Sequence, residues 1–337
     1  MKNIVNIISL MLISLSALSC SQQKDSVYKK TMPLMDTVVS ISVVSDAKDA
    51  AEKAIDASFE KIDRFGNLIN FYAEKSELSE INRNAGIQKT KVSPETLDLI
   101  EKAIAVSERS GGAFDPTIGP IVKLWDFLNK KKPADEEIRR ALPLVDYRNV
   151  IIDKTDATVF LKKRGMMLDL GGIAKGYAAD LAVASLIESG MQAGLVSIAG
   201  DIRTFGLKPD KKPWAIGIKN PRQTSEKDEL IATIGLSDKA ISTSGDYERY
   251  FMEDGMRLHH LLDPKTGYPA TACRSVSIVT DRAVNTDAFS TAVFILGPEK
   301  GMTLARELGM EAIIIDSSGT RYLTDNVKEQ LTFEKGA

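Results

Sequence analysis

Repeating patterns of apolar residues predict the first elements of the chain. Residues 38–44 alternate valine or isoleucine with serine, which is typical of a strand with one buried face. Between Ala51 and Ile69, apolar or small residues recur at steps of four and three, and this spacing predicts a long helix with one buried face. Ser93 and Pro94 predict the N-cap and first turn of another helix.

The rest of the chain mixes predicted strands and helices. The clearest elements are a hairpin at Asn149–Leu161, a helix at Ala174–Glu188, a helix at Asp287–Leu296 capped by Thr286, and a helix from Pro298 to Gly309. The charged segment Lys130–Arg140 is predicted to be a surface insertion. Because strands and helices show no steady βαβ alternation, the pattern favours an α+β fold over a doubly wound sheet.

The first residues have the pattern of a segment that is removed on export. Lys2 precedes an apolar stretch from Ile4 to Leu18, which is shorter than the ~20 residues that a transmembrane helix needs. A basic start, an apolar core and small residues at its end are typical of a signal peptide. We therefore expect residues 1–19 to be a lipoprotein signal peptide.

Cys20 stands directly after that apolar core, as the modified cysteine of a lipoprotein does. Its thiol would take a diacylglycerol, and the polar run Ser21–Ser26 that follows is typical of a solvated linker. We expect residues 20–30 to be the lipidated cysteine and tether, and residues 31–337 to be the folded domain. The protein would be exported and lipid-anchored to a bacterial membrane, facing the periplasm. Ordinary secretion with an incidental Cys20 is the alternative.

Charge and rare residues exclude several classes of protein. The 337 residues include 44 Lys and Arg against 46 Asp and Glu, and this net charge of −2 argues against nucleic-acid binding. Two cysteines exclude a disulfide-dense scaffold and a cysteine-based zinc or iron–sulfur site. The two histidines, His259 and His260, leave little room for a multi-histidine metal centre.

Two segments carry paired glycines between apolar elements. In residues 110–120 the pair precedes Phe114, which could stack on a flat ring, and in residues 168–177 it lies between a strand and a helix. Glycine lets backbone approach a ligand closely, and helix N-termini favour phosphates. Alone, either segment is more typical of a tight turn, and the second has neither the Walker A nor the Rossmann pattern.

Asp287, Ser290 and Thr291 would share one turn of a helix, since they are spaced i, i+3 and i+4. Such hard oxygen groups are the ligands that Mg²⁺ prefers, and it keeps waters and substrate phosphates as its other ligands. A capping aspartate with a threonine bonded to its own backbone is the alternative.

The adjacent histidines offer one candidate base. If residues 257–262 form a strand, only one of His259 and His260 faces a given side. Histidine is the natural neutral-pH base for a hydroxyl nucleophile. A hydrogen-bonded structural histidine ahead of a turn is the alternative. The chain has no G-x-S-x-G segment, so serine-hydrolase chemistry has no support.

Together these segments resemble the ApbE-type flavin transferases, the FAD:protein FMN transferases, from about Met32 to beyond Gly301. The resemblance rests on six segments in the family's order and spacing. They are Gly112-Ala113-Phe114-Asp115-Pro116, Leu168-Asp169-Leu170-Gly171-Gly172-Ile173-Ala174-Lys175-Gly176-Tyr177, Ala199-Gly200-Asp201-Ile202-Arg203, Ile241-Ser242-Thr243-Ser244-Gly245, His260-Leu261-Leu262-Asp263-Pro264 and Asp287-Ala288-Phe289-Ser290-Thr291.

The resemblance implies a single domain with mixed, largely antiparallel sheets and flanking helices. It implies that an acceptor Thr or Ser hydroxyl attacks the FMN-side phosphorus of FAD, that AMP leaves, and that FMN stays attached as a phosphoester. His260 would be the base, and Mg²⁺ would be held by Gly172, Asp287 and Thr291, with Ser290 alongside. The implied FAD contacts are Met35, Tyr72, Ala113, Phe114, Asp115, Asp169, Lys175 and Leu262.

One position departs from the family pattern. The family's early Met-Gly-Thr is Met35-Asp36-Thr37 in this chain. If that glycine serves a turn with a positive φ, aspartate is among the better-tolerated replacements. The departure therefore bears on the Met35 contact and not on the activity.

The same site would also suit two other functions. An FAD pyrophosphatase would use water instead of the hydroxyl and release FMN and AMP. A non-catalytic FAD-binding lipoprotein would leave FAD unchanged, although the presence of Asp287, Thr291 and His260 argues against it. The acceptors implied by the resemblance are a subunit of the sodium-translocating NADH:quinone reductase, of the related Rnf complex, or of another exported reductase.

Overall fold

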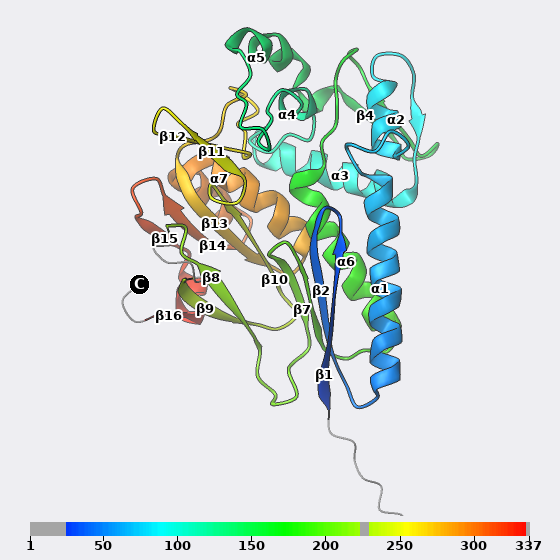
Figure 1. Cartoon of the computed structure of the whole chain (residues 1–337), viewed down its shortest axis with the longest axis vertical. Helices are drawn as coiled ribbons and strands as arrows, with labels where there is room; N and C mark the ends of the chain where they lie inside the picture. The colour runs from blue at the N-terminus through cyan, green and yellow to red at the C-terminus, as the bar shows by residue number, and fades with distance from the viewer. Residues whose placement is uncertain (1–24, 223–228, 335–337) are drawn as a thin grey trace, which may run out of the picture.

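The fold is built on one large antiparallel sheet. The computed structural model describes residues 25–222 and 229–334 (Figure 1). Within them, an eight-stranded sheet has every pair of neighbouring strands antiparallel. In spatial order its strands are β1 (Ser26–Leu34), β2 (Thr37–Ser45), β6 (Gly194–Ile198), β7 (Asp201–Phe205), β10 (Ala240–Gly245), β13 (Cys273–Thr280), β14 (Glu311–Asp316) and β15 (Arg321–Leu323).

Three long helices cover one face of this sheet. They are α1 (Lys48–Leu68), α6 (Gly171–Glu188) and α7 (Ala283–Glu307). Ile55 of α1, Ile41 of β2 and Ile278 of β13 are fully buried in the core between the two layers. The helix predicted from the spacing of residues 51–69 therefore forms, and its apolar face packs as the periodicity requires.

A smaller sheet and a short helix cover the opposite face. Their elements are β8 (Trp214–Lys219), β9 (Leu230–Leu236), α8 (Asp325–Gln330) and β16 (Leu331–Phe333). Side chains of β10 alternate between the two layers: Ile241 packs toward the small sheet, whereas Ser242 and Ser244 hydrogen-bond to α7. The strand therefore presents hydroxyl groups to the helix that carries Asp287.

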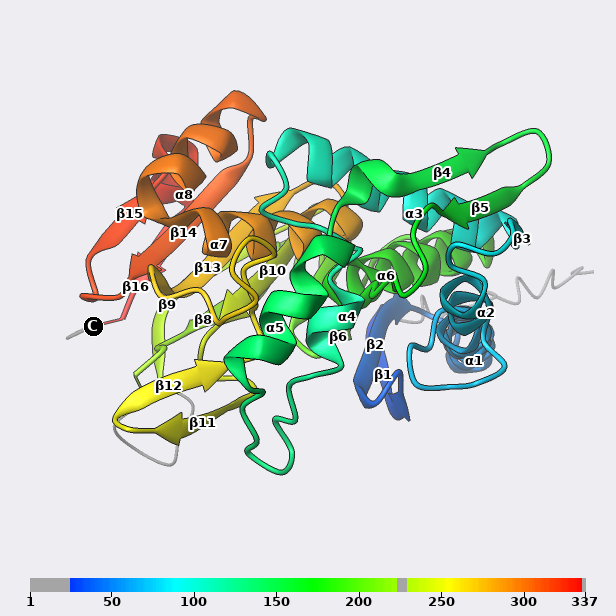
Figure 2. The same ribbon diagram turned by 90° about the horizontal axis from the view of Figure 1, so that it is seen from above.

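The remaining elements gather at the upper end of the molecule in Figure 1. They are α2 (Glu77–Arg83), β3 (Thr90–Lys91), α3 (Pro94–Arg109), α4 (Gly119–Val122), α5 (Asp135–Ala141), two 3₁₀ turns (Leu142–Leu144 and Tyr147–Asn149), β4 (Val150–Asp153), β5 (Thr158–Leu161), β11 (Tyr250–Glu253) and β12 (Met256–His259). Figure 2 shows the β11–β12 hairpin and the β3–β5–β4 sheet on opposite sides of this end. A third apolar cluster joins α4 and α5 to the hairpin through Trp125, Phe251 and Leu262.

The expected α+β fold is confirmed, but several boundaries were wrong. Residues 26–30, assigned to the tether, pair with Ser45 to Ile41 as the start of β1, so the folded part begins earlier than residue 31. Helix α7 begins at Ala283, and Thr286 lies inside its first turn, where its hydroxyl bonds to the Ala283 carbonyl instead of capping the helix. A kink at Gly297, with φ 78°, separates the two predicted helical parts.

The charged segment 130–140 is only partly a surface insertion. It contains the start of α5, whose Ile138 is 2% exposed and belongs to the third cluster. The proposed signal peptide and Cys20 lie outside the described residues. Among the residues that are described, no helix is both long and apolar enough to cross a membrane.

Met35 and Asp36 form the two-residue turn between β1 and β2. Their φ angles are 52° and 56°, and the flanking residues Leu34 and Thr37 are paired. A two-residue hairpin turn with two positive φ angles favours asparagine, aspartate or glycine. Asp36 therefore stands at a position with the backbone conformation anticipated for the family's glycine.

Candidate functional site

Two glycine-containing segments, far apart in sequence, meet at the start of α6. Helix α6 begins at Gly171, so the glycine pair forms its first turn instead of preceding it. The backbone N–H of Asp169 donates to the Pro116 carbonyl at 2.7 Å. A Cβ on Gly172 would lie 3.2 Å from the Phe114 ring, which is tighter than ordinary contact. The ring of Phe114 therefore lies against the N-terminus of α6.

Helices α6 and α7 approach closely at Gly176. A Cβ at this position would lie 2.1 Å from the Ala283 carbonyl oxygen and 2.8 Å from the Asp287 Cβ, so only glycine fits. The Gly176 N–H donates to Asp287 Oδ2 at 2.9 Å. Its ordinary helical acceptor is the Gly172 carbonyl. The close approach thus fixes the Asp287 carboxylate beside the first turns of α6.

Lys175 lies between two buried carboxylates. Its Nζ is 2.9 Å from Asp201 Oδ2 and 3.2 Å from Asp287 Oδ1, and each aspartate side chain is only 6% exposed. Burial raises the pKa of Asp287, and the Asp201 carboxylate raises it further, while Lys175 opposes both. Burial alone would lower the pKa of Lys175, but the two carboxylates outweigh it and raise that pKa. The ammonium group is therefore held charged.

Hydroxyl groups complete this cluster on the β10 side. Ser244 Oγ lies 2.9 Å from Ser290 Oγ and 3.2 Å from Thr291 Oγ1. Ser290 also donates to the Asp287 carbonyl at 2.9 Å, so its hydroxyl is engaged within the protein. Thr291 has Ser244 as its hydroxyl partner and retains lone-pair capacity. Of the two hydroxyls predicted on α7, Thr291 is the better placed to meet a ligand.

These groups fit a hard divalent cation. A Cβ on Gly172 would lie 3.7 Å from Thr291 Oγ1, and Gly176 is bonded to Asp287, so the first turns of α6 adjoin both α7 side chains. Carboxylate, hydroxyl and carbonyl oxygens are the donors that Mg²⁺ prefers. Among the described residues no three His, Cys, Asp or Glu side chains gather as a metal site. A cation there would depend on backbone, hydroxyl and ligand oxygens as well as on Asp287.

The two adjacent histidines have different surroundings. His259 is 3% exposed, and its Nε2 lies 2.8 Å from the Ala270 carbonyl, while its Nδ1 accepts the Leu261 N–H at 3.3 Å. Its ring also packs edge-on against Phe294. By contrast, His260 Nδ1 is buried and, within the described part of the chain, has no hydrogen-bond partner. His259 is therefore the structural histidine, and His260 is the one available for chemistry.

The His260 ring is kept neutral. Burial lowers its pKa to about 3, and the positive charges of Arg249 and Lys175 act in the same direction. A neutral imidazole has one nitrogen that can accept a proton. At neutral pH His260 is therefore in the form that a general base requires.

The other predicted FAD contacts differ in whether their polar atoms are already hydrogen-bonded within the protein. The Asp115 carboxylate accepts hydrogen bonds from the Thr117 N–H and hydroxyl, at 2.8 Å and 2.6 Å, and from the Tyr147 N–H at 3.0 Å. Its carboxylate therefore braces its own loop. Asp169 Oδ1 accepts the Gly171 N–H, and burial raises the pKa of the Asp169 carboxyl.

Tyr72 and Met35 lie on the open side, whereas Ala113 and Leu262 are buried. Tyr72 is 76% exposed, and partial burial raises its pKa, with smaller contributions in the same direction from the Asp169 and Asp36 carboxylates. Met35 packs near Gly66 of α1, and Ala113 and Leu262 are 2% and 4% exposed. A planar ring could therefore be met by Tyr72 and Phe114 from different segments.

Three residues important to the cluster had no role assigned from sequence. Asp201, Ser244 and Gly176 all lie inside the six segments that carry the family resemblance. Their roles depend on contacts across the fold: Asp201 with Lys175, Ser244 with Thr291, and Gly176 with Asp287. Only their presence in those segments could have marked them.

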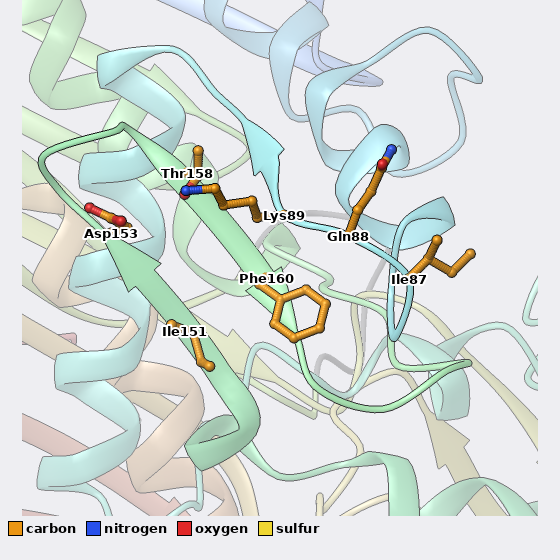
Figure 3. A pocket seen from close by; sticks show the side chains of 7 residues that line it. All are labelled: Ile87, Gln88, Lys89, Ile151, Asp153, Thr158 and Phe160. Atoms are coloured by element: carbon orange, nitrogen blue, oxygen red, sulfur yellow. The ribbon is translucent and has the colours of Figure 1, made fainter.

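Two surface hollows lie outside this centre. Figure 3 shows one of about 310 Å³ between β4, β5 and the segment before β3, lined by Ile87, Ile151 and Phe160. A second, of about 320 Å³, lies under the β1–β2 turn and includes Met35 and Asp36. Neither contains Lys175, His260 or Asp287, so the hollows alone do not identify the site.

Comparison with known proteins agrees with this geometry. Residues 35–314 match the family described as the ApbE family. An FAD:protein FMN transferase of Treponema pallidum is 35% identical over 307 residues, which cover 86% of this chain and 84% of the relative.

Solved structures extend the likeness to three dimensions. The crystal structure of an ApbE protein of Thermotoga maritima is 36% identical, with a TM-score of 0.84, over 90% of this chain and 99% of that one. The apo form of the flavinyl transferase ApbE of Pseudomonas stutzeri is 30% identical, with a TM-score of 0.80, over 91% of this chain and 97% of that one. Because the matched family spans most of the chain, this chain belongs to the ApbE family.

Proposed function

We propose that this chain transfers FMN from FAD to a Thr or Ser hydroxyl of an acceptor flavoprotein and releases AMP. The observation that carries the proposal is the pairing of two features in one site. His260 is neutral, its Nδ1 has no hydrogen-bond partner among the described residues, and it lies near enough to Lys175 for that charge to lower its pKa. Lys175 in turn joins the oxygen cluster of α6 and α7. The relatives that match the chain carry the name of this activity.

The reaction requires a base and a stabilised leaving group. The acceptor hydroxyl oxygen forms a bond to the FMN-side phosphorus, and the bond from that phosphorus to the oxygen bridging the two phosphates breaks. His260 accepts the hydroxyl proton, and AMP leaves with the bridging oxygen. Charge grows on the phosphate oxygens during this step, so donors already fixed in place should contribute most of the rate enhancement.

Mg²⁺ fits the oxygen cluster described above. The Gly172 carbonyl, Asp287 and Thr291 would hold it, with Ser290 alongside, where its hydroxyl is bonded to Ser244 and to the Asp287 backbone carbonyl. When bound, Mg²⁺ would neutralise phosphate charge and act as a Lewis acid. Lys175 would contact the neighbouring phosphate oxygens, because its ammonium group is held charged beside Asp287 and its side chain remains 24% exposed.

FAD would lie across the two glycine-containing segments. Phe114 and Tyr72 offer rings to the isoalloxazine, and the Asp169 carboxylate is near enough to Tyr72 to raise the pKa of its hydroxyl. Met35, Ala113 and Leu262 would provide backbone or apolar contacts, whereas Asp115 would act by bracing its loop. Met35, Ala113 and Leu262 have apolar side chains, and the Asp115 carboxylate is already hydrogen-bonded within its own loop.

The acceptor and the location complete the proposal. We expect an exported acceptor, such as a subunit of a sodium-translocating NADH:quinone reductase or an Rnf-type complex. Cys20 would carry a lipid anchor that holds the enzyme at a bacterial membrane, facing the periplasm. Radiolabelled palmitate incorporation in growing cells, lost in Cys20→Ser, tests the anchor, and an unlabelled wild-type protein would contradict it.

Mass spectrometry tests the activity. Residues 21–337 are mixed with FAD, Mg²⁺ and an exported acceptor domain, and the acceptor should gain the mass of an FMN phosphoester while AMP accumulates. AMP and free FMN formed equally fast with and without acceptor would instead identify a pyrophosphatase. Unchanged FAD with several acceptors would leave only a flavin-binding role.

A further inference from the structure

The β11–β12 hairpin places Arg249 opposite His260. Tyr250 pairs with His259 at the base of the hairpin, and the next residues continue the ladder through the His260 N–H and the Arg249 carbonyl at 3.1 Å. Arg249 and His260 lie just outside the two paired strands, and this backbone hydrogen bond makes them direct neighbours. The Arg249 charge is near enough to lower the pKa of His260.

Arg249 differs from the two other arginines near this hairpin. Arg222 and Arg257 both pair with Asp246, at 2.6 Å and 3.4 Å, and the Arg257 guanidinium also lies 4.1 Å from the Tyr250 ring centre. Arg249 is exposed, and no carboxylate of the described residues forms an ion pair with it. Its charge is therefore available to a ligand.

The acidic groups around Lys175 would repel a diphosphate, so a further positive charge would favour its binding. Lys175 is shared by Asp201 and Asp287, and Asp169 adds a carboxyl group that accepts the Gly171 N–H at the start of α6. An incoming diphosphate would meet these acidic groups, and Lys175 is already paired with two of them. The Arg249 charge reaches this region, since it lowers the pKa of Asp169, of Tyr72 and of His260.

We propose that Arg249 is a binding residue for the diphosphate of FAD, on the His260 side of the site. This inference rests on the proposed function and adds a residue to it. The flavin and adenosine parts of FAD are uncharged at neutral pH, so the diphosphate is the part of FAD that an unpaired guanidinium binds through opposite charge. Its planar donors suit two phosphate oxygens at once, which a lysine ammonium cannot match.

Binding measurements separate this role from a structural one. Affinities of the Arg249→Gln protein for FAD and for riboflavin are measured by flavin fluorescence, with EDTA present so that FAD is not consumed. Loss of a charge-assisted pair should weaken FAD binding by about tenfold or more. Riboflavin, which has no phosphate, should bind as it does to wild type. Arg249→Lys, which keeps the charge, should recover part of the loss.

Arg257→Gln is the matched control, because it removes a charge from the same hairpin at an arginine that is already paired. It should leave the ratio of FAD to riboflavin affinity unchanged. An equal loss for both ligands in Arg249→Gln, unchanged FAD binding, or the same selective loss in Arg257→Gln would each overturn the inference.

The binding ratio also keeps this test apart from the test of activity. A wild-type protein that binds FAD through Arg249 yet modifies no acceptor would contradict the proposed function alone. A wild-type protein that modifies its acceptor, with FAD affinity indifferent to Arg249→Gln, would contradict this inference alone.

Discussion

The two sides of the site differ in how far their polar groups are already paired. On the α6–α7 side, Asp287, Lys175 and Thr291 all have partners at 2.9 to 3.2 Å within the protein. On the hairpin side, the His260 Nδ1 has no partner among the described residues, and Arg249 has no carboxylate there. One side is fixed before any ligand arrives, and the other retains unsatisfied groups.

This difference indicates a division of labour: the α6–α7 side binds the cation and the phosphates, and His260 on the hairpin side takes part in the chemistry. Oxygen atoms and an ammonium group that are already fixed in place can bind a cation and a phosphate without reorganising. Electrostatic stabilisation is most effective when the groups are preorganised in this way. A buried nitrogen without a partner costs free energy in the resting protein, and such a cost is typical of functional sites. We therefore expect changes on the α6–α7 side to affect binding and chemistry together, and changes at His260 to affect chemistry alone.

The largest effect is expected from Asp287→Asn, which keeps the shape of the side chain but removes its charge. Transfer should fall by about a thousandfold, because the cation site and the field on the phosphates are both lost. Transfer rates at increasing Mg²⁺ concentrations measure the effect. A variant that retains wild-type rates and Mg²⁺ dependence would remove Asp287 from the site.

Lys175→Met tests the pairing on the same side. It leaves Asp201 and Asp287 without their shared cation, and the free energy of unfolding should fall by about 3 kcal/mol, allowing for the partial exposure of the lysine. Added Mg²⁺ should stabilise the variant more than wild type. Urea unfolding with and without Mg²⁺ measures both. Equal Mg²⁺ stabilisation of the two proteins would place the cation elsewhere.

His260→Asn and His259→Asn form a matched pair. The first should slow transfer by about a hundredfold while FAD still binds, because a general base is lost. The second should lower the free energy of unfolding by about 1–3 kcal/mol through its lost buried hydrogen bonds. Single-turnover transfer and FAD titration distinguish them. If His260→Asn loses FAD affinity and rate in parallel, His260 is a binding residue.

The low pKa of His260 also predicts a pH dependence of stability. Its pKa is about 3 in the folded protein and near 6.5 when unfolded, so between these values the unfolded chain binds the extra proton. The fold keeps its full stability above pH 6.5, where His260 is neutral in both states, and it loses stability as the pH falls toward 3. Unfolding free energies at pH 7 and pH 5 should show wild type losing about 1–2 kcal/mol relative to His260→Asn. A difference independent of pH would show that His260 titrates normally.

The smallest effect is expected at the β1–β2 turn. Asp36 has a φ of 56°, which glycine adopts without steric cost, so Asp36→Gly should change stability by no more than about 0.5 kcal/mol. FAD affinity should be unchanged. Thermal unfolding and FAD titration test this, and a large gain in FAD affinity would show that the Asp36 side chain obstructs the ligand.

Sequence patterns predicted the layers of the fold better than they predicted the site. The periodicity of α1 and the hairpin β4–β5 follow from local spacing, and both form as predicted. The start of α7 was misplaced because Thr286 has the side chain of a cap, yet its hydroxyl bonds to Ser242 of β10 and to Ala283. A tertiary contact thus replaced the local role.

The candidate site shows the same limit. The helical spacing of Asp287 and Thr291 placed both residues on one turn, and the resemblance brought Lys175 and Gly172 to them. Nothing in the local sequence indicated that Asp201 would form an ion pair with Lys175, or that the Asp115 carboxylate would be hydrogen-bonded within its own loop. Spacing along one helix is readable from sequence, whereas pairing between segments far apart depends on the whole fold.

A crystal structure with FAD and Mn²⁺ in place of Mg²⁺ tests the division of labour most directly. We predict an anomalous Mn²⁺ peak beside Asp287, Thr291 and the Gly172 carbonyl, with the FMN-side phosphate between that ion and the His260 ring. A metal peak away from Asp287, or a diphosphate that reaches neither Lys175 nor His260, would contradict the account.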